Sequence, residues 1–437
     1  MTSSILKLAD EMWGRREPTS IVASILTGAE EVADGVLMVP GFGHAFALRH
    51  EHGVVLFDTG VKLLADKLHE QVTAWDSGPV THAVYSHGHV DHVGGLGPFD
   101  AAADARGVPR PEVIAHDNVL ARFRRYADTR GYNTIINRRQ FRIPDLVWPT
   151  EFREPDVTFS DTHTVEAGGL RLELTHHRGE TDDHVVGWLP RQRILFPGDL
   201  FLGVAPNAGN PQKVQRYPVD WAAALRWMAS LDAELMLGSH GIPIVGADHV
   251  REALENTARY LETLVDQTLA CLNDGATLVE TLHRVRVPDD LAALHYLQPL
   301  YDEPEFIVRN VWRQFAGWYD GNPAHLKPAT DAALAAELAA LSGGAQVLAD
   351  RALELSRAGE HRLACHLAQL AGDAAPEDKA VHTARAEVYA LRAAQERSTM
   401  SIGIFSWAEA ESRDVLNGPD AIAEPAPDRV PPRDRRA

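Results

Sequence analysis

The sequence predicts an α/β domain over residues 1–247, followed by an all-α domain over residues 248–415. Two observations carry this prediction. In the first part, short apolar runs that look like strands alternate with helical stretches, and these strand signals stop after His240. In the second part, apolar side chains recur near helical spacing over His249–Leu272, and residues 329–398 are rich in Ala, Leu, Glu and Arg.

Residues 86–95 are the most informative segment of the first part. An apolar run that looks like the end of a strand precedes them, and two glycines close them. Four side chains of metal-binding type fall within this segment: His87, His89, Asp91 and His92. Imidazole and carboxylate are ligands that suit zinc. Because residues after a strand can point to different sides, we expect the first two histidines to serve one ion, and Asp91 and His92 a second.

The His-x-His-x-Asp-His pattern at residues 87–92 resembles the signature of the metallo-β-lactamase superfamily. The resemblance implies an α/β fold of the metallo-β-lactamase type, an αββα sandwich with one or two metal ions at the edge of its sheets. It also implies that further metal ligands stand at the ends of later strands.

Three later strand-like runs end as the resemblance requires. Leu170–Leu174 alternates apolar and polar residues, as a half-buried strand does, and leads toward Glu180. Asp199 follows a short apolar run and matches the family's metal-bridging carboxylate. His240 follows another apolar run and matches the last histidine ligand. Asp58, after an early apolar run, matches the structural aspartate beneath the family's site.

The sequence Gly179-Glu180-Thr181 narrows the resemblance to one branch of the superfamily. Most of the superfamily has a histidine where Glu180 stands, and a glutamate here looks like the alkylsulfatase branch. The resemblance then implies two zinc ions (Zn2+) per chain, bridged by Asp199 and a hydroxide. The implied ligand sets are His87, His89 and Glu180 on one ion, and Asp91, His92 and His240 on the other. Three nearby histidines could compete for these ligand roles, although a supporting or plain polar role is favoured for each: His176, His177 and His184.

The implied chemistry is hydrolysis by a metal-bridging hydroxide. Two zinc ions lower the pKa of a bridging water toward neutrality and polarise the bond under attack. Asp91 is thereby predicted as a catalytic residue as well as a ligand. His44, in the turn at residues 41–44, is predicted to polarise the substrate or donate a proton, with a polar turn residue as the alternative. Cys271 and Cys365 are too few for a zinc ligand set or a disulfide framework.

The predicted substrate contacts depart in part from the alkylsulfatase pattern. Asn207 stands at the asparagine of that family's Asn-x-x-x-x-Arg sulfate-binding element, but Gln212 stands at the arginine, followed by Lys213. A guanidinium binds sulfate oxygens bidentately, whereas lysine is a point charge. The absence of the arginine therefore affects which substrate the site is expected to bind. Pro206 replaces a histidine that would be a candidate acid for the leaving group.

A second basic element is closer to the family pattern. Arg138 and Arg139 resemble the Arg-Arg segment of the loop that covers the alkylsulfatase active site, with a solvated loop as the alternative. Tyr126 belongs to the same stretch and is predicted to line the pocket, although loop tyrosines often pack only locally. The predicted substrate-binding set is therefore Asn207, Arg138, Arg139, Lys213, Gln212 and Tyr126.

These features predict a dinuclear-zinc hydrolase that cleaves an ester of a small organic molecule, with an alkyl sulfate as the first candidate. A lactonase, thioesterase or other carboxylic ester hydrolase is the alternative, because the same hydroxide attacks a carbonyl and the lost arginine is then expected. Phosphodiester hydrolysis is less favoured. Outside enzymes, a metal-stabilised scaffold protein is the remaining hypothesis, which one tightly held zinc would favour over two exchangeable ones.

Composition sets outer bounds on partners and location. The 437 residues carry a net charge of −19, which argues against nucleic acid as a partner and is compatible with a small, even anionic, substrate. The N-terminus lacks a charged start followed by an apolar segment. No stretch approaches the about 18 uninterrupted apolar residues of a membrane span. We therefore expect a cytoplasmic protein with no membrane partner.

The all-α domain is expected to be a helical, TPR-like dimerisation domain. Breaks at Gly343-Gly344, Gly359 and Pro376 separate antiparallel helices, without a clean repeat of about 34 residues. Phe315–Leu326 resembles the segment that opens the alkylsulfatase dimerisation domain, which implies a homodimer; packing of its aromatic side chains inside the protomer is the alternative. Residues 416–437 are rich in Pro and Arg and are expected to form a disordered tail.

Overall fold

A computed structural model describes residues 3–20, 25–26 and 28–418. The chain forms two compact units: one draws on residues 1–130 and 149–321, the other on residues 131–148 and 322–437. The predicted α/β part and the predicted helical part are both present. The exact domain boundaries expected after residues 247 and 415 stay predictions.

The first unit is built on two β-sheets. The first sheet has the order β1-β2-β3-β4-β5-β6-β7, antiparallel as far as β4 and parallel from β4 to β7. Its strands are β1 Glu30–Ala33, β2 Val36–Val39, β3 Ala45–His50, β4 Gly53–Phe57, β5 Val80–Val84, β6 Glu112–His116 and β7 Val157–Phe159. The second sheet has the order β13-β12-β11-β10-β9-β8, with only the β11–β12 pair parallel among these. Its strands are β8 Thr162–Ala167, β9 Leu170–His176, β10 Val185–Leu189, β11 Ile194–Phe196, β12 Leu235–Met236 and β13 Ile244–Val245.

The two sheets pack face to face through an aromatic core. Phe46 of β3 and Phe57 of β4 contact Phe196 of β11, with ring centroids 5.2 and 5.1 Å apart. Burying side chains of this size contributes about 1.5–3 kcal/mol each, so this layer is a main source of stability. Every residue of β4 is buried, as expected for a strand covered on both faces.

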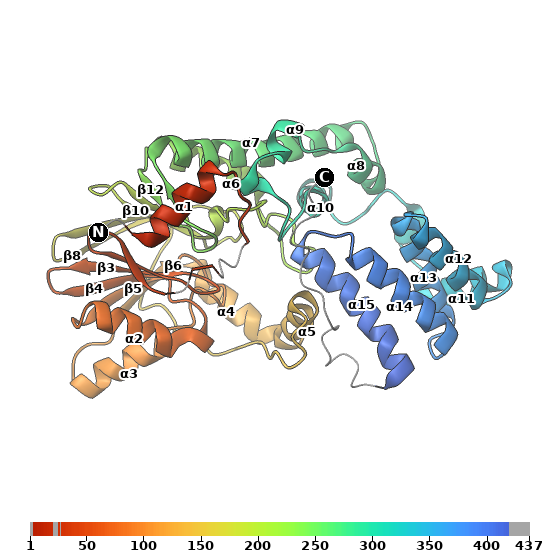
Figure 1. The fold of residues 1–437 in the computed structure, drawn as a ribbon, viewed down its shortest axis with the longest axis horizontal. Helices are drawn as coiled ribbons and strands as arrows, with labels where there is room; N and C mark the ends of the chain where they lie inside the picture. Colours follow the sequence, from red (N-terminus) through yellow and green to blue (C-terminus); the bar gives the residue numbers. More distant parts are fainter. Residues whose placement is uncertain (1–2, 21–24, 27, 419–437) are drawn as a thin grey trace. The chain divides into compact units, whose positions relative to one another are not determined.

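Helices cover both outer faces and complete the predicted αββα sandwich. Figure 1 shows α2 and α3 on one side of the paired sheets and α6 and α7 on the other. Leu68 of α2 and Phe99 of α3 pack on the first sheet, while Trp221 of α6 and Leu254 of α7 pack beside the second. The helices of this unit are α1 Ser4–Gly14, α2 Ala65–Trp75, α3 Gly97–Arg106, α4 Asn118–Asp128, α6 Pro218–Ser230, α7 Ala247–Asn273, α8 Leu278–Arg284, α9 Asp289–Ala292 and α10 Pro304–Ala316. Short 3-10 turns stand at Lys62–Leu64, Gly198–Leu200 and His295–Leu297.

The ends of the strands explain why polar residues that are distant in sequence gather at one edge. β4 and β5 run parallel, so Asp58 and the segment at residues 86–95 leave the first sheet at the same edge. β11 and β12 are also parallel, which brings Asp199 and His240 together at the edge of the second sheet. Ligands of α/β folds commonly bind outside such carboxyl ends.

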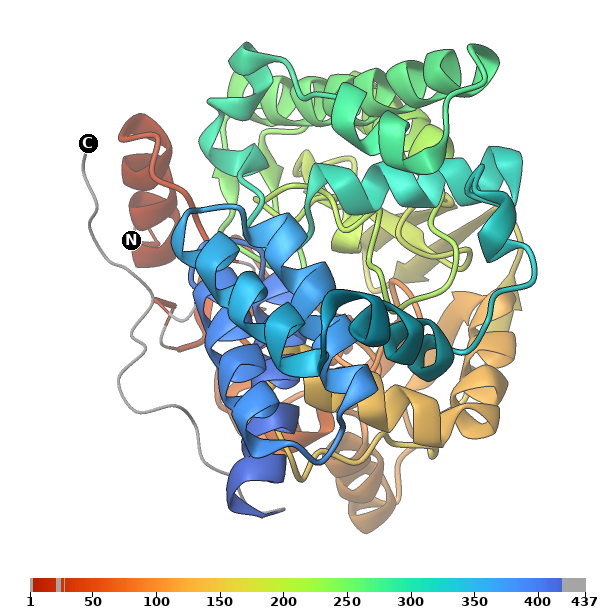
Figure 2. The same ribbon diagram turned by 90° about the vertical axis from the view of Figure 1, so that its right-hand side faces the viewer.

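The second unit is helical, as predicted. Its helices are α5 Arg130–Phe141, α11 Asp331–Ser342, α12 Ala345–Arg357, α13 His361–Ala374, α14 Lys379–Ala393 and α15 Thr399–Asn417, with a 3-10 turn at Pro323–His325. Figure 2 shows the later helices, in blue, stacked side by side. Ala371 of α13 and Val381 of α14 lie in one small core. The predicted breaks at Gly343-Gly344 and Gly359 separate α11, α12 and α13.

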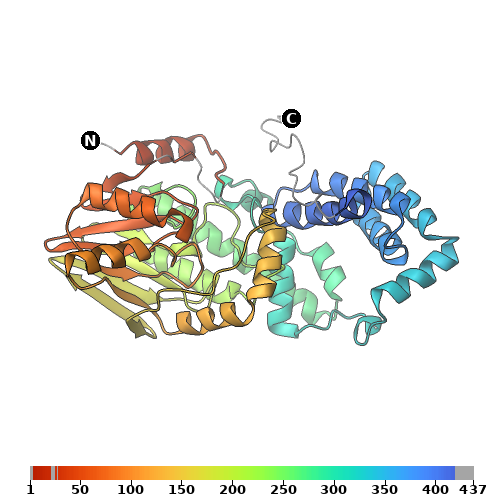
Figure 3. The same cartoon turned by 90° about the horizontal axis from the view of Figure 1, so that it is seen from below.

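One local prediction differs from the structure. The stretch around Arg138 and Arg139 was expected to be a loop, but it forms α5 and packs on α15, as Figure 3 shows. Gly403 of α15 lies directly against α5, because a Cβ at this position would stand 2.3 Å from the Gln140 carbonyl oxygen. This tertiary contact, which no local pattern reveals, accounts for the helix.

Two further expectations concern the ends and the surface of the chain. The tail predicted over residues 416–437 lies outside the described residues from 419 onward, and Leu416 and Asn417 close α15. Among the described helices, none alone has the length and apolar composition to cross a membrane; the bent pair α11–α12 meets these criteria by length and composition only.

Candidate metal centre

The structure brings all seven predicted ligands together in two adjacent groups. The first group is His87, His89, Glu180 and Asp199, and the second is Asp91, His92 and His240. His89 Nδ1 lies 3.4 Å from Glu180 Oε2, and His240 Nε2 lies 3.4 Å from Asp91 Oδ2. Ligand atoms arranged tetrahedrally around zinc stand about 3.3–3.4 Å apart, so these separations fit one ion in each group.

Asp199 touches both groups through different oxygens. Its Oδ2 lies 3.7 Å from His87 Nε2, and its Oδ1 lies 3.5 Å from both His92 Nε2 and His240 Nε2. This placement is the one expected of a carboxylate that bridges two cations.

The residues present fit a metal, as their hydrogen bonding shows. His92 Nε2, Glu180 Oε2 and Asp199 Oδ1 are buried and make no hydrogen bond. Buried polar atoms in native proteins nearly always have a partner. Glu180 Oε2 faces His89 Nδ1, and His92 Nε2 faces Asp199 Oδ1. A cation beside each pair of atoms would supply the missing interaction.

The charges of the second group favour a cation. Burial alone would lower the pKa of His240, but the carboxylates of Asp199 and Asp91 raise it to about 10. Burial would raise the pKa of Asp91, but His92 and His240 lower it to about 2. In the first group, burial holds the pKa of His87 well below its usual value, which keeps the ring neutral. The carboxylates thus demand positive charge, which protons or a metal ion can provide.

Asp58 holds the second group from beneath. Its carboxylate accepts hydrogen bonds from the Ser86 amide at 2.7 Å, and from Ser86 Oγ, His92 Nδ1 and Ser239 Oγ, each at 2.8 Å. With its Nδ1 proton donated to Asp58, His92 presents a bare Nε2 to a cation. Asp58 has a φ of 56°, in the left-handed region that aspartate tolerates better than most side chains.

An Arg–Asp pair holds the loop of His87 and His89. Asp183 Oδ2 accepts from the Gly88 amide at 3.0 Å and from Arg122 Nε at 2.8 Å. Arg122 overcomes the effect of burial and lowers the Asp183 pKa. A Cβ at residue 88 would lie 2.9 Å from Arg122 Cδ, which explains the glycine between the two histidines. The sequence analysis did not identify this pair. The two consecutive acidic residues Asp182 and Asp183, shortly after Glu180, were a visible signal of it.

Glu180 is fixed through the oxygen that does not face the cluster. Arg216 Nη1 forms an ion pair with Glu180 Oε1 at 2.5 Å and donates to the Glu180 carbonyl at 2.9 Å. Asn207 Nδ2 also donates to Oε1. The predicted substrate residue Asn207 therefore lies against a ligand, and Glu180 Oε2 is left to face His87 and His89.

Two of the neighbouring histidines, His184 and His176, contact residues around the cluster. His184 Nε2 accepts a hydrogen bond from the Asp199 amide at 3.0 Å, and its ring stacks on His87 with centroids 4.9 Å apart. Gly198 fits beneath it, since a Cβ there would lie 2.5 Å from His184 Cε1. His176 Nδ1 donates to the His184 carbonyl at 2.9 Å, and its ring stacks on His116.

His44 links two loops of the site. Its Nδ1 accepts from the Gly41 amide at 3.2 Å, and its Nε2 donates to the Gly241 carbonyl at 2.9 Å. Burial lowers the pKa of His44 to about 4, which matches a neutral ring used at both nitrogens. In this geometry His44 secures the turn at residues 41–44 to the loop of His240, and its catalytic role stays a prediction.

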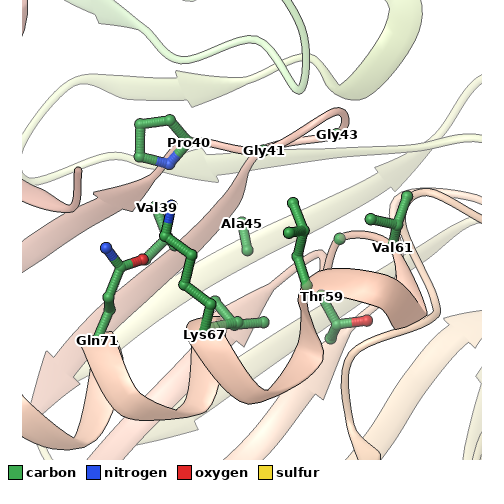
Figure 4. Close-up of a pocket in the computed structure, with 12 residues that line it drawn as sticks. Val39, Pro40, Gly41, Gly43, Ala45, Thr59, Val61, Lys67 and Gln71 are labelled. Carbon is green, nitrogen blue, oxygen red and sulfur yellow. The ribbon is translucent and has the colours of Figure 1, made fainter. Parts of the chain in front are cut away.

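A small hollow borders the same turn. Figure 4 shows it between the turn after β2 and the first turns of α2, with Val39 and Pro40 facing Lys67 and Gln71. Its lining contains none of the seven candidate ligands. The hollow is therefore separate from the metal cluster.

The remaining predicted substrate residues fall in different places. Gln212 is buried and Lys213 is half-buried. Burial and the charge of Arg216 lower the pKa of Lys213 to about 7, while Asp91 and Glu180 raise it, so Lys213 is within electrostatic reach of the cluster. Tyr126 is buried on α4, close to Arg122.

The two predicted arginines belong to the second unit. Arg138 and Arg139 lie in the last turn of α5, and Arg138 Nε donates to the Leu146 carbonyl at 2.8 Å. Their role in binding substrate stays a prediction.

Known proteins resemble this chain in both of its parts. Residues 38–240 match the model of the metallo-beta-lactamase superfamily, and residues 277–415 match the model of alkyl sulfatase dimerisation. A linear primary-alkylsulfatase from Pseudomonas sp. (strain ATCC 19151) is 26% identical over 312 residues, 67% of this chain and 59% of the relative. An (R)-specific secondary-alkylsulfatase from Pseudomonas sp. is 26% identical over 336 residues, 71% of this chain and 50% of the relative. The chain thus spans between half and three-fifths of the length of these two relatives.

A solved structure extends the likeness in fold. The stereoselective inverting sec-alkylsulfatase Pisa1 from Pseudomonas sp. superimposes with a TM-score of 0.78 at 21% identity, over 90% of this chain and 66% of that chain. The order of a two-sheet sandwich followed by helices is therefore shared with a known protein.

Proposed function

We propose that this chain, whose residues 38–240 carry a domain of the metallo-β-lactamase superfamily, is a metal-dependent hydrolase that cleaves sulfate esters of small organic molecules. An alkyl sulfate is the first candidate substrate. The observation that carries the proposal is Glu180, which stands in the first ligand group where most of the superfamily has a histidine. The alkylsulfatase relatives and the match over residues 277–415 support the same branch.

Two zinc ions are the proposed cofactor. His87, His89 and Glu180 would hold one, Asp91, His92 and His240 the other, and Asp199 would contact both. When bound, such ions acidify a coordinated water and polarise the bond under attack. The two groups of donors, and the unpartnered ligand atoms in each, support a pair rather than a single ion.

The chain's own residues then orient the candidate ligands and limit the access of water. Asp58 and Arg216 orient His92 and Glu180, so that the donor atoms need not reorganise. Burial of five of the seven candidate ligands limits the access of bulk water, which strengthens the charge interactions among them. Lys213, whose pKa responds to Asp91 and Glu180, supplies a positive charge that would attract an anionic ester.

A carboxylic ester hydrolase, such as a lactonase or thioesterase, is the second candidate. Gln212 and Pro206 favour it, because they stand where the alkylsulfatase pattern has an arginine and a histidine. A neutral carbonyl substrate needs neither a bidentate anion contact nor that acid.

We also propose that the protein acts as a homodimer. Phe315 and Trp318, at the end of α10, are 51% and 71% exposed, whereas the neighbouring Trp312 is buried. Aromatic side chains so exposed are typical of surfaces that a partner covers. Both lie within the segment that matches the alkyl sulfatase dimerisation model.

Sulfate release tests the proposed activity. Zinc-loaded protein is incubated with primary and secondary alkyl sulfates, with and without a chelator, and sulfate is measured by ion chromatography. Release that the chelator abolishes supports the proposal. If fully metallated protein releases no sulfate but hydrolyses lactones or thioesters, the second candidate replaces the first.

A further inference from the structure

The segment at residues 205–216 connects a metal ligand to residues much later in the chain. It carries Asn207 and Arg216, which both contact Glu180. Three points along it are bonded to residues beyond position 297. The Ala205 amide donates to the Gln298 carbonyl at 3.0 Å, and the amides of Gly209 and Asn210 donate to Asp302 Oδ2 at 2.5 and 3.1 Å.

The third point is a pair of hydrogen bonds between the side chain of Asn310 and the backbone of Arg216. Asn310 Nδ2 donates to the Arg216 carbonyl at 2.9 Å, and the Arg216 amide donates to Asn310 Oδ1 at 3.3 Å. Asn310 lies on α10 and is 2% exposed. A buried amide that meets both backbone groups of one residue fixes the direction in which its side chain leaves the chain.

That direction leads to the carboxylate of Glu180. The side chains of Arg216 and Glu180 are 3% and 1% exposed, so neither charge is shared with solvent. A buried guanidinium is stable only beside such a partner. Since Arg216 holds Oε1, the carboxylate cannot rotate, and Oε2 stays directed at His87 and His89.

We propose that Arg216 is a positioning residue for Glu180, and that Asn310 on α10 sets Arg216 in place. Helix α10 therefore tunes the metal affinity of the His87, His89 and Glu180 group. This inference rests on the proposed function only in that it requires the cluster to bind metal. Asn310 falls within the segment that matches the alkyl sulfatase dimerisation model, so that segment also builds part of the metal centre.

The test follows each metal-binding step separately in the full-length protein. Metal-free protein is titrated with zinc against a chromophoric chelator, which gives two dissociation constants. The variant His89→Ala identifies the step that belongs to the first group. We expect Arg216→Gln to weaken that same step by about 10- to 100-fold, the usual effect of removing a partner of a metal-bound side chain, and to change the other step less than about threefold.

Two further variants keep the test decisive. Asn310→Ala is expected to weaken the same step by a smaller factor, and Arg216→Lys, which keeps the charge, is expected to restore part of the affinity. Arg178→Gln is the matched control, because Arg178 pairs only with Asp220 among the ion pairs described here and is 51% exposed. We expect this control to change neither step.

The absorption spectrum of cobalt-loaded protein adds a readout of ligand geometry. Arg216→Gln should alter the bands that His89→Ala removes and leave the others. Two unchanged steps in a folded Arg216→Gln variant, or equal weakening of both steps, would overturn the positioning role while leaving the proposed function intact. Failure of the wild-type chain to bind zinc would overturn both.

Discussion

The two ligand groups are adjacent, yet the chain supports them in different ways. His92 is held by Asp58, whose carboxylate also accepts from Ser86 and Ser239; these three residues follow strands β4, β5 and β12. Glu180 is held by Arg216, and Arg216 by Asn310 on α10. The first support belongs to the sandwich itself, whereas the second depends on a helix that follows the sandwich in sequence. One half of the site thus follows from the sheets, and the other from the helix that follows them.

Loss of one ligand from each group gives the largest expected effect and tests whether the groups are separate. His89→Ala and His240→Ala should each remove one metal and lower activity by more than the about 100-fold that marks the upper range for supporting residues. Metal content by mass spectrometry and turnover are the measurements. If either variant keeps both metals at wild-type turnover, the assignment of that ligand is wrong.

Replacing Asp58 should sharpen the comparison. In Asp58→Asn, His92 loses its charged acceptor, so we expect zinc to bind the Asp91, His92 and His240 group about 10- to 100-fold more weakly. Unfolding should also require less free energy, by about 1–3 kcal/mol for each buried donor left without a partner. Denaturation and zinc titration measure both effects.

Asp183→Asn is the matched variant on the other side, since Asp183 holds the loop of His87 and His89. It should weaken the first group and spare the second. If Asp58→Asn and Asp183→Asn weaken the same metal-binding step, the two supports are not independent.

The candidate ligands could be named from the sequence because residues 87–92 resemble a known signature and most of the others follow short strand-like runs. Asp58, Asp199 and His240 each follow a short apolar run, and parallel pairing brings those ends to one edge. Arg216 and Asn310 could not be found in this way. Their bonds join side chain to backbone across 94 residues, and no spacing in the sequence marks them.

The helix α5 was missed for a similar physical reason. A loop was expected here because Arg138 and Arg139 resemble the Arg-Arg segment of a loop in alkylsulfatases. The helix is stabilised by packing on α15, where Gly403 allows a close approach to the Gln140 carbonyl. Such tertiary contacts routinely outweigh the intrinsic helix propensity of a short segment.

The pH dependence of substrate binding offers a further, smaller test. The pKa of Lys213 is lowered to about 7, so its ammonium is charged below pH 7 and neutral above it. We expect the KM for an alkyl sulfate to rise as the pH increases through 7, by at most about tenfold per unit, because one proton is lost. The KM for a neutral ester should stay flat over the same range.

Lys213→Arg keeps a charge at all these pH values and should abolish the rise. A wild-type KM for alkyl sulfate that is independent of pH from 6 to 8 would remove Lys213 from the substrate site.

The smallest effect on activity is expected at the exposed end of α10. Trp318→Ser removes an exposed apolar side chain and should shift the protein from dimer toward monomer, with less than about a twofold change in turnover. Sedimentation velocity measures the shift. Asn310→Ala, on α10 itself, should weaken metal binding instead. If Trp318→Ser also releases metal, the segment that follows α10 is coupled to the helix.

The number of exchangeable zinc ions per chain distinguishes a two-ion catalytic site from a single structural ion. Purified protein is stripped, reloaded with zinc, and passed through a desalting column; zinc and protein are then quantified together. Two exchangeable zinc ions per chain, falling to one in both His89→Ala and His240→Ala, is the result expected from two groups that share Asp199. A single, tightly held zinc that survives in either variant would contradict the account and favour a structural metal site.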